Sequence, residues 1–292
     1  MLAADDLAVV SAPVEERTSG TATPADAHRR RVSARSIFDA TWPKLAAVAI
    51  FVFVWQCVVW SGWKSETILP GPRRVGSSLW DITESGLLRR AVGITFQRAL
   101  AGFAAAIVIG VAIGLAVASS TIVRRAIGSM ITGIQTMPSI AWFPLAIVLF
   151  QLDEGAIRFV VILGAAPAIA NGLIMGIDHV PPLLLRAGRV IGARGVNAYR
   201  HIILPATLPS FVGGLKQGWA FAWRSLMAGE LLVVIASKPS IGQQMQQSRS
   251  LSRYSDMIAW MVVVFVIGLL VDALAFGTLD RAIRRRWGLL AD

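Results

Sequence analysis

The chain contains four long runs without a charged residue. The first covers residues 45–63, and about 20 apolar residues are enough to cross the hydrocarbon core of a bilayer as one helix. The other three are each bounded by Arg, Asp or Glu, and they cover residues 99–123, 126–152 and 159–177. The pattern therefore predicts four transmembrane helices.

Two further apolar segments, residues 202–237 and 257–279, contain isolated charges and are expected to form the fifth and sixth spans. In order along the chain, these charges are Lys216, Arg224, Glu230 and Asp272. The sequence thus predicts an all-α, polytopic membrane protein with six transmembrane helices. An even number of spans leaves both termini on the same side of the membrane.

The composition supports this interpretation. Of the 292 residues, 55% are hydrophobic and 15% are charged, and the mean hydropathy is +0.63, whereas a soluble domain carries about 25% charged residues. A wholly disordered or collagen-like chain is excluded, and the single cysteine, Cys57, excludes an intrachain disulfide framework. The net charge of +11 does not indicate a nucleic-acid partner, because Lys and Arg mostly separate the apolar runs instead of gathering on a solvated face.

Residues 1–44 contain no apolar run long enough to form a core, and we predict a disordered tail. Asp5 and Asp6 lie where a cleaved signal peptide would have its basic start, so residues 45–63 are expected to remain as a span. If the tail is cytoplasmic, the segments on its side of the membrane carry 16 Lys and Arg and the opposite segments carry nine. Since cytoplasmic loops are enriched in Lys and Arg, both termini are predicted to be cytoplasmic.

Five of the nine opposite-side charges lie in residues 64–93. Val75, Leu79 and Ile82 in this segment have the spacing of one apolar helix face. Such a helix could lie along the membrane surface, and an irregular polar loop is an equally good reading.

The segment between the fourth and fifth spans, about residues 180–206, is basic and rich in helix boundaries. Pro181 and Pro182 suit a helix start, and Gly192 permits a sharp exit from it. A second short helix is expected from about Val196 to near Pro205. Two short helices that project from the membrane would form a compact plug, which suits docking to a partner.

This loop resembles that of the permease subunits of bacterial ATP-binding-cassette (ABC) importers. The family reads Glu-Ala-Ala, three residues, Gly, nine residues, then Ile-x-Leu-Pro, and the spacing here is the same. Two residues depart from the pattern, since Arg186 replaces the Glu and Gly188 the second Ala. The matching segment consists of Arg186, Ala187, Gly188, Gly192, Ile202, Leu204 and Pro205. The resemblance implies that this loop is the coupling helix, which sits in a groove of the ATPase subunit.

Other stretches are similar to the sulfonate, nitrate and taurine branch of this family. They are residues 68–72, 97–103 and 138–145, and the similarity covers about residues 45–287. The resemblance implies a type I ABC importer permease fold over residues 45–292, in the cell membrane. It also implies a homodimer that works with two ATPase subunits and an extracytoplasmic binding protein.

No Gly-x-x-x-x-Gly-Lys-Ser/Thr phosphate loop is present, so ATP is expected to bind to the partner ATPase and the chain itself is expected not to be an enzyme. His28, His179 and His201 are scattered and form no His-Glu-x-x-His pair. We therefore expect no metal site and no resident cofactor.

The third span contains a candidate translocation pathway. Pro138 removes a backbone hydrogen bond and would leave polar groups at depth, which is tolerated where backbone faces protein or a water-filled cavity. The residues concerned are Gln135, Thr136, Met137, Pro138, Ser139 and Trp142. The alternative is a packing kink whose hydroxyls bond back to their own helix.

Charges in the fifth span are the second candidate, because a charge at the bilayer centre is costly unless it is paired or hydrated. Arg224 could attract an oxyanion, and Glu230 is included in the predicted pathway. Alternatively both pair with other helices, and Lys216 snorkels to the inner boundary. Four glycines in this segment are expected to permit close helix packing, namely Gly213, Gly214, Gly218 and Gly229.

An aliphatic sulfonate is the first substrate hypothesis, with nitrate, taurine or another small ligand as alternatives. A competing class is a secondary transporter or membrane enzyme that works without an ATPase. That class would need a proton relay at depth, for which Glu230 and Asp272 form the only candidate pair.

Overall fold

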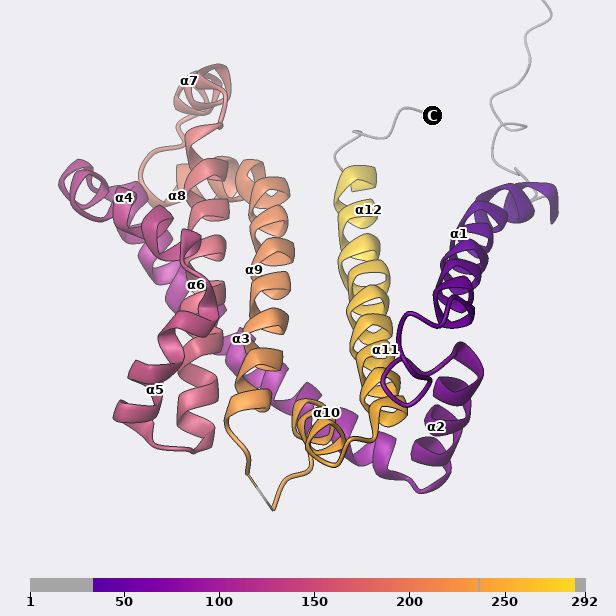
Figure 1. Ribbon diagram of the computed structural model, residues 1–292. Coiled ribbons are helices and arrows are strands. Elements are labelled where there is room, and N and C mark those ends of the chain that lie inside the picture. The colour runs from indigo at the N-terminus through magenta and orange to yellow at the C-terminus, as the bar shows by residue number, and fades with distance from the viewer. Residues whose placement is uncertain (1–33, 236, 287–292) are drawn as a thin grey trace, which may run out of the picture. The chain divides into compact units, whose positions relative to one another are not determined.

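The computed structural model describes residues 34–235 and 237–286, and these residues form helices joined by short turns and loops, with no strand among them. Figure 1 shows the helices in chain order. Their bounds are α1 Ala34–Trp60, α2 Pro72–Glu84, α3 Leu87–Ser119, α4 Thr121–Thr136, the 3-10 helix η2 Ser139–Trp142, α5 Phe143–Phe150, α6 Glu154–Asp178, α7 Pro182–Val190, α8 Val196–Ala198, the π-helix η3 Tyr199–Ile203, α9 Leu204–Leu232, α10 Ile241–Ser250, α11 Tyr254–Val271, the π-helix η4 Asp272–Phe276 and α12 Gly277–Arg286.

The chain divides into two units, Met1–Val54 and Trp55–Asp292, with the boundary inside α1. In the first unit α1 begins at Ala34, so the last part of the predicted tail is helical. The rest of that predicted tail, residues 1–33, lies outside the described residues. All contacts discussed below lie within the second unit.

Four of the six predicted spans correspond to single membrane-length helices, with different boundaries. Four helical segments are long and apolar enough to cross a membrane, namely Trp42–Trp60, Leu87–Ser119, Glu154–Asp178 and Tyr254–Ile283. A fifth would be the pair formed by α4 and residues 139–150, which is bent by 104°. The predicted fifth span is the 29-residue helix α9, which is long enough for a sixth crossing but carries three charged residues. The count of six is therefore compatible with the helices without being fixed by them.

Helix α6 is the centre of the core and packs against α3 and α9, which is visible in Figure 1. Its buried face is made largely of Ala, Gly and β-branched residues. At Gly172 and Gly214 the α6 and α9 backbones approach so closely that a Cβ built on Gly172 would lie 2.5 Å from the Cα of Gly214. Small residues at such crossings allow close backbone packing where lipid provides no hydrophobic drive.

Three of the four glycines predicted to permit close packing do so: Gly214, Gly218 and Gly229 all face neighbouring atoms. Gly213 does not, because a Cβ at that position would meet nothing within 4 Å.

The amphipathic segment forms α2, so the irregular loop is not observed. Its apolar residues Val75 and Ile82 are buried in a cluster with Ile241 and Trp260. This corrects the predicted role, because the apolar face packs on protein helices instead of on lipid.

The first prediction tests the Gly172–Gly214 crossing. Gly172→Ala should lower the free energy of unfolding by about 1–3 kcal/mol, the usual cost of overpacking a tight core. The midpoint of thermal unfolding in detergent measures this change. Gly213→Ala is the matched control, and it should be neutral or stabilising because its Cβ meets nothing within 4 Å and Ala favours helix over Gly. Equal loss in both variants would contradict the crossing as the cause.

Candidate translocation cavity and coupling loop

The chain breaks between α4 and η2 at Met137 and Pro138. Met137 is extended, with φ −71° and ψ 131°, and the helices on the two sides differ in direction by 104°. Pro138 has no N–H to continue the α4 ladder, and the residue before a proline is driven out of the helical region. The predicted break is therefore confirmed, and it is sharper than a kink.

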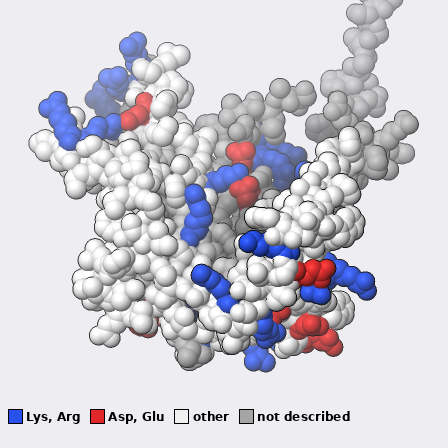
Figure 2. Space-filling model, viewed as in Figure 1, with Lys and Arg blue, Asp and Glu red and all other residues white. Residues whose placement is uncertain are grey.

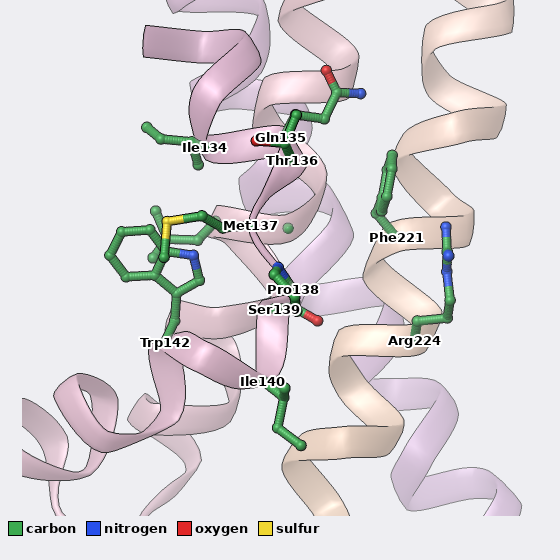
Figure 3. Close-up of a pocket in the computed structure, with 12 residues that line it drawn as sticks. Ile134, Gln135, Thr136, Met137, Pro138, Ser139, Ile140, Trp142, Phe221 and Arg224 are labelled. Atoms are coloured by element: carbon green, nitrogen blue, oxygen red, sulfur yellow. The ribbon is translucent and has the colours of Figure 1, made fainter.

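A cavity of about 350 Å³ lies between this break, α6 and α9. Figure 3 shows Phe221 and Arg224 on α9, across from Pro138 and Ser139. Seven of the eight predicted pathway residues line the cavity, namely Gln135, Thr136, Met137, Pro138, Ser139, Trp142 and Arg224. Their role in carrying a substrate stays a prediction, but the structure places them around one space.

The polar groups at the break differ in their partners. The Thr136 hydroxyl donates to the carbonyl oxygen of Gly133 at 2.8 Å, as the packing alternative expects. The Asn171 amide on α6 donates to Oε1 of Gln135 at 2.7 Å, so Gln135 ties the end of α4 to α6.

Arg224 is the cation of this cavity. Its Nε donates to the carbonyl oxygen of Ala220 at 3.2 Å, and its guanidinium carbon lies 4.7 Å from the centre of the Phe221 ring. Within the described residues no carboxylate pairs with it. Lys216, by contrast, pairs with Asp272 at 3.0 Å, a contact that the predicted snorkelling of Lys216 did not include. Arg224 therefore keeps N–H donors available to an anion.

Glu230 does not line the cavity, and its place among the predicted pathway residues needs correction. Its side chain is 0% exposed and lies 3.0 Å from Nη1 of Arg98 on α3. It also accepts hydrogen bonds from the Thr95 hydroxyl and from the backbone N–H of Gly242. A carboxylate without water needs such partners, so Glu230 joins α3, α9 and α10, the alternative in which it pairs with other helices.

Sequence reasoning missed Arg98, which organises this buried cluster. Its Nη2 donates to Glu154 at 2.7 Å, and Lys238 reaches the same carboxylate at 3.3 Å. Two signals were present, because Arg98 directly precedes the uncharged run 99–123 and Glu154 is the first residue of the apolar helix α6. Neither signal indicated that Arg98 pairs with Glu230, which lies 132 positions away in the sequence.

The predicted coupling loop begins as expected and ends differently. Helix α7 starts at Pro182, and Gly192 turns the chain with φ +84°. The second short helix does not end near Pro205, because α8 and η3 continue directly into α9, whose first turn contains Pro205. The N–H groups of a helix's first turn have no intrahelical acceptor, so a proline there removes no helical hydrogen bond. Helix α9 can therefore include Pro205 in its first turn.

The motif positions Gly188 and Ile202 contact each other across the loop. A Cβ at Gly188 would overlap Cδ1 at the end of the Ile202 side chain, so an Ala at this position would require Ile202 to change its rotamer. This contact closes α7 against η3.

The outer surface of the loop is apolar and basic. Its exposed apolar residues include Val190 and Ile191, which are 87% and 82% exposed. Figure 2 shows Lys and Arg side chains gathered at this corner of the molecule. The exposed basic residues of the loop are Arg186, Arg189, Arg194 and Arg200. Exposed apolar groups with a charged rim are typical of a protein-docking surface.

Residues 106–288, more than half of the chain, match the family described as binding-protein-dependent transport system inner membrane component. The chain belongs to this family. It is therefore the multi-pass membrane permease subunit of an ABC importer and not an enzyme, which confirms the family predicted from the loop.

Two relatives and one solved structure illustrate the similarity. The putative aliphatic sulfonates transport permease protein SsuC of Escherichia coli is 30% identical, over 77% of this chain and 84% of that protein. The nitrate import permease protein NrtB of Synechocystis is 28% identical, over 77% of this chain and 83% of that protein. A crystal structure of the inward-facing MetNI methionine ABC transporter matches with a TM-score of 0.58 and 21% identity, over 69% of this chain and 98% of that one, and shows the fold.

The second prediction tests the buried cluster around Arg98 and Glu230. Arg98→Ala should lower the free energy of unfolding by about 3–5 kcal/mol, because it leaves the 0%-exposed carboxylate of Glu230 without its cation. Adding Glu230→Gln should recover part of this loss, since the double variant buries no unpaired charge. Unfolding midpoints in detergent measure both effects. Arg74→Ala, which breaks an exposed pair with Glu66, is the control and should cost about 0–1 kcal/mol. A loss at Arg98 no larger than this control would contradict the interpretation.

Proposed function

We propose that this permease translocates a small oxyanion, with an aliphatic sulfonate as the first candidate, through the cavity at the Pro138 break. An extracytoplasmic binding protein delivers the anion. Two ATPase subunits bind and hydrolyse ATP, and a second copy of the permease completes the pathway. Both termini lie in the cytoplasm, on the same side as the coupling loop.

The observation that carries this proposal is the position of Arg224. The Arg224 guanidinium, which pairs with no carboxylate of the described residues, lies at the cavity wall, opposite a helix break that carries polar groups. Its planar fork suits bidentate contact with sulfonate or nitrate oxygens. Phe221 on α9 and Trp142 on the side of the break add apolar surface to the cavity, which suits the alkyl part of a sulfonate.

The relatives support the same chemistry. One is named for aliphatic sulfonates and one for nitrate, and both substrates are small oxyanions. An arginine in a water-accessible cavity attracts such a group without enclosing it, which lets the anion leave again.

The surface of the coupling loop supports docking to an ATPase. Val190, Ile191 and the arginines around them face outward, away from the Gly188–Ile202 contact that shapes the loop. A partner with an apolar groove and an acidic rim would cover them. ATP-driven closure of the two ATPases would then move the loop and tilt α4, α6 and α9.

The competing secondary transporter loses its support, because its candidate relay is already neutralised. Glu230 pairs with Arg98 and Asp272 pairs with Lys216, and neither carboxylate lines the cavity at the break. A proton relay needs carboxylates that face the pathway.

The third prediction tests the substrate. A strain that lacks this permease should fail to grow on an alkanesulfonate as sole sulfur source, and the wild-type gene should restore growth. Arg224→Ala should lower alkanesulfonate uptake about tenfold or more, because a hydrogen bond to a charged group is worth about 1.5–3 kcal/mol. Arg224→Lys should fall between the two, since it keeps the charge and loses the fork. Undiminished growth of the deletion strain would exclude the sulfonate, and full uptake by Arg224→Ala would exclude Arg224 as its contact.

The fourth prediction tests the docking surface. Val190→Asp and Ile191→Asp should each weaken association with the ATPase about tenfold or more, because burying such a side chain contributes about 1.5–3 kcal/mol. Copurification of the two subunits from membranes measures this effect. Leu251→Asp, which changes an exposed apolar residue between α10 and α11, is the control and should leave the complex intact. An intact complex in all three variants would contradict the docking role.

A further inference from the structure

The first turn of α4 and the last turn of α6 are joined by an ion pair. Arg124 Nη1 lies 2.6 Å from Asp178 Oδ2, and Nη2 lies 3.0 Å from Oδ1. Such a two-point contact fixes the orientation of both side chains as well as their distance. It joins residues 54 positions apart, at the same end of the molecule as the coupling loop (Figure 1).

The placement of these charges is unfavourable for either helix alone. Arg124 lies in the first turn of α4, where the helix dipole disfavours a cation, and Asp178 is the last residue of α6, where the dipole disfavours an anion. Each charge offsets the other only through the tertiary contact. Local helix stability therefore does not explain why these residue types lie at these positions.

The pair connects the coupling loop with the cavity. Asp178 is followed by three residues and then by α7, which begins at Pro182. Arg124 lies on α4, a continuous helix of 16 residues that ends at the break lining the cavity. The opposite end of α4 is tied to α6 by the Gln135–Asn171 hydrogen bond of 2.7 Å.

We propose that Arg124 and Asp178 are positioning residues that form a coupling joint, through which movement of the coupling loop shifts α4 and so changes the width of the cavity at the Pro138 break. This proposal rests on the ATP-driven import proposed above. Side chains about 40% exposed contribute little to stability, so breaking the pair should spare the fold and disturb the transmission.

The experiment uses the complete transporter in proteoliposomes, with an alkanesulfonate as the probe. Arg124→Ala and Asp178→Ala should each lower uptake per ATP hydrolysed at least about fivefold, the lower end of usual coupling strengths. The exchanged pair, R124D with D178R, should recover most of this loss. Arg125→Ala is the matched control, since Arg125 is the exposed neighbour and makes no ion pair among the described residues. Equal loss in Arg125→Ala, or no loss in Arg124→Ala, would overturn the proposal.

A second measurement requires neither uptake of the substrate nor correct folding of the double variant R124D with D178R. Spin labels at Gly133→Cys on α4 and Gly213→Cys on α9 report the distance between these two helices, and both positions accept a side chain because a Cβ there meets nothing within 4 Å. Cys57→Ser removes the only native cysteine, and an excess of unlabelled permease isolates distances within one chain. Trapping with ATP and vanadate should change the distance in the wild type and leave it unchanged in Arg124→Ala.

The two measurements separate the two proposals. The same distance change in Arg124→Ala, or none in the wild type, would overturn the coupling joint. If the distance change depends on Arg124 while the alkanesulfonate is not taken up, the joint stands and the proposed substrate falls.

Discussion

The close approach of α6 and α9 is the constraint on which the arrangement depends. At Gly172 and Gly214 the two backbones nearly touch, and neither position has room for a side chain. This crossing fixes how far Leu163 on α6 and Phe221 on α9 can separate, and both residues line the cavity. A membrane protein gains little from burying apolar groups against each other instead of against lipid, so close backbone contact is an important source of stability where α6 and α9 cross.

The charges within the helices fall into two kinds. Glu230 is completely buried, and its oxygens are used by Arg98, Thr95 and a backbone N–H, so it belongs to the scaffold. Among residues 34–235 and 237–286, the partners of the Arg224 guanidinium are a backbone carbonyl and an aromatic ring, so it remains able to bind an anion. The two residues lie six positions apart on one helix. Only their different partners distinguish Glu230, a structural charge, from Arg224, a candidate functional one.

The loop and the cavity are linked by continuous helices. Helix α6 leads from the Gly172 crossing to the start of the coupling loop, and η3 leads from that loop directly into α9. Both helices that line the cavity opposite the break are therefore extensions of the docking surface. The Arg124–Asp178 pair adds α4 to this set, so all three walls of the cavity have a connection to the loop.

The sequence by itself determined the class of protein, the positions of most helices and the interruption at Pro138. These depend on local properties: uncharged length, proline chemistry and the spacing of Ala, Gly, Ile, Leu and Pro. It also placed seven cavity residues correctly together, because six of them lie within eight positions of one another. It could not decide the partner of Glu230, the face on which α2 packs, or the continuation of α8 into α9. Only the tertiary structure decided these, because each depends on residues distant in sequence that compete for the same charge, apolar face or helix end.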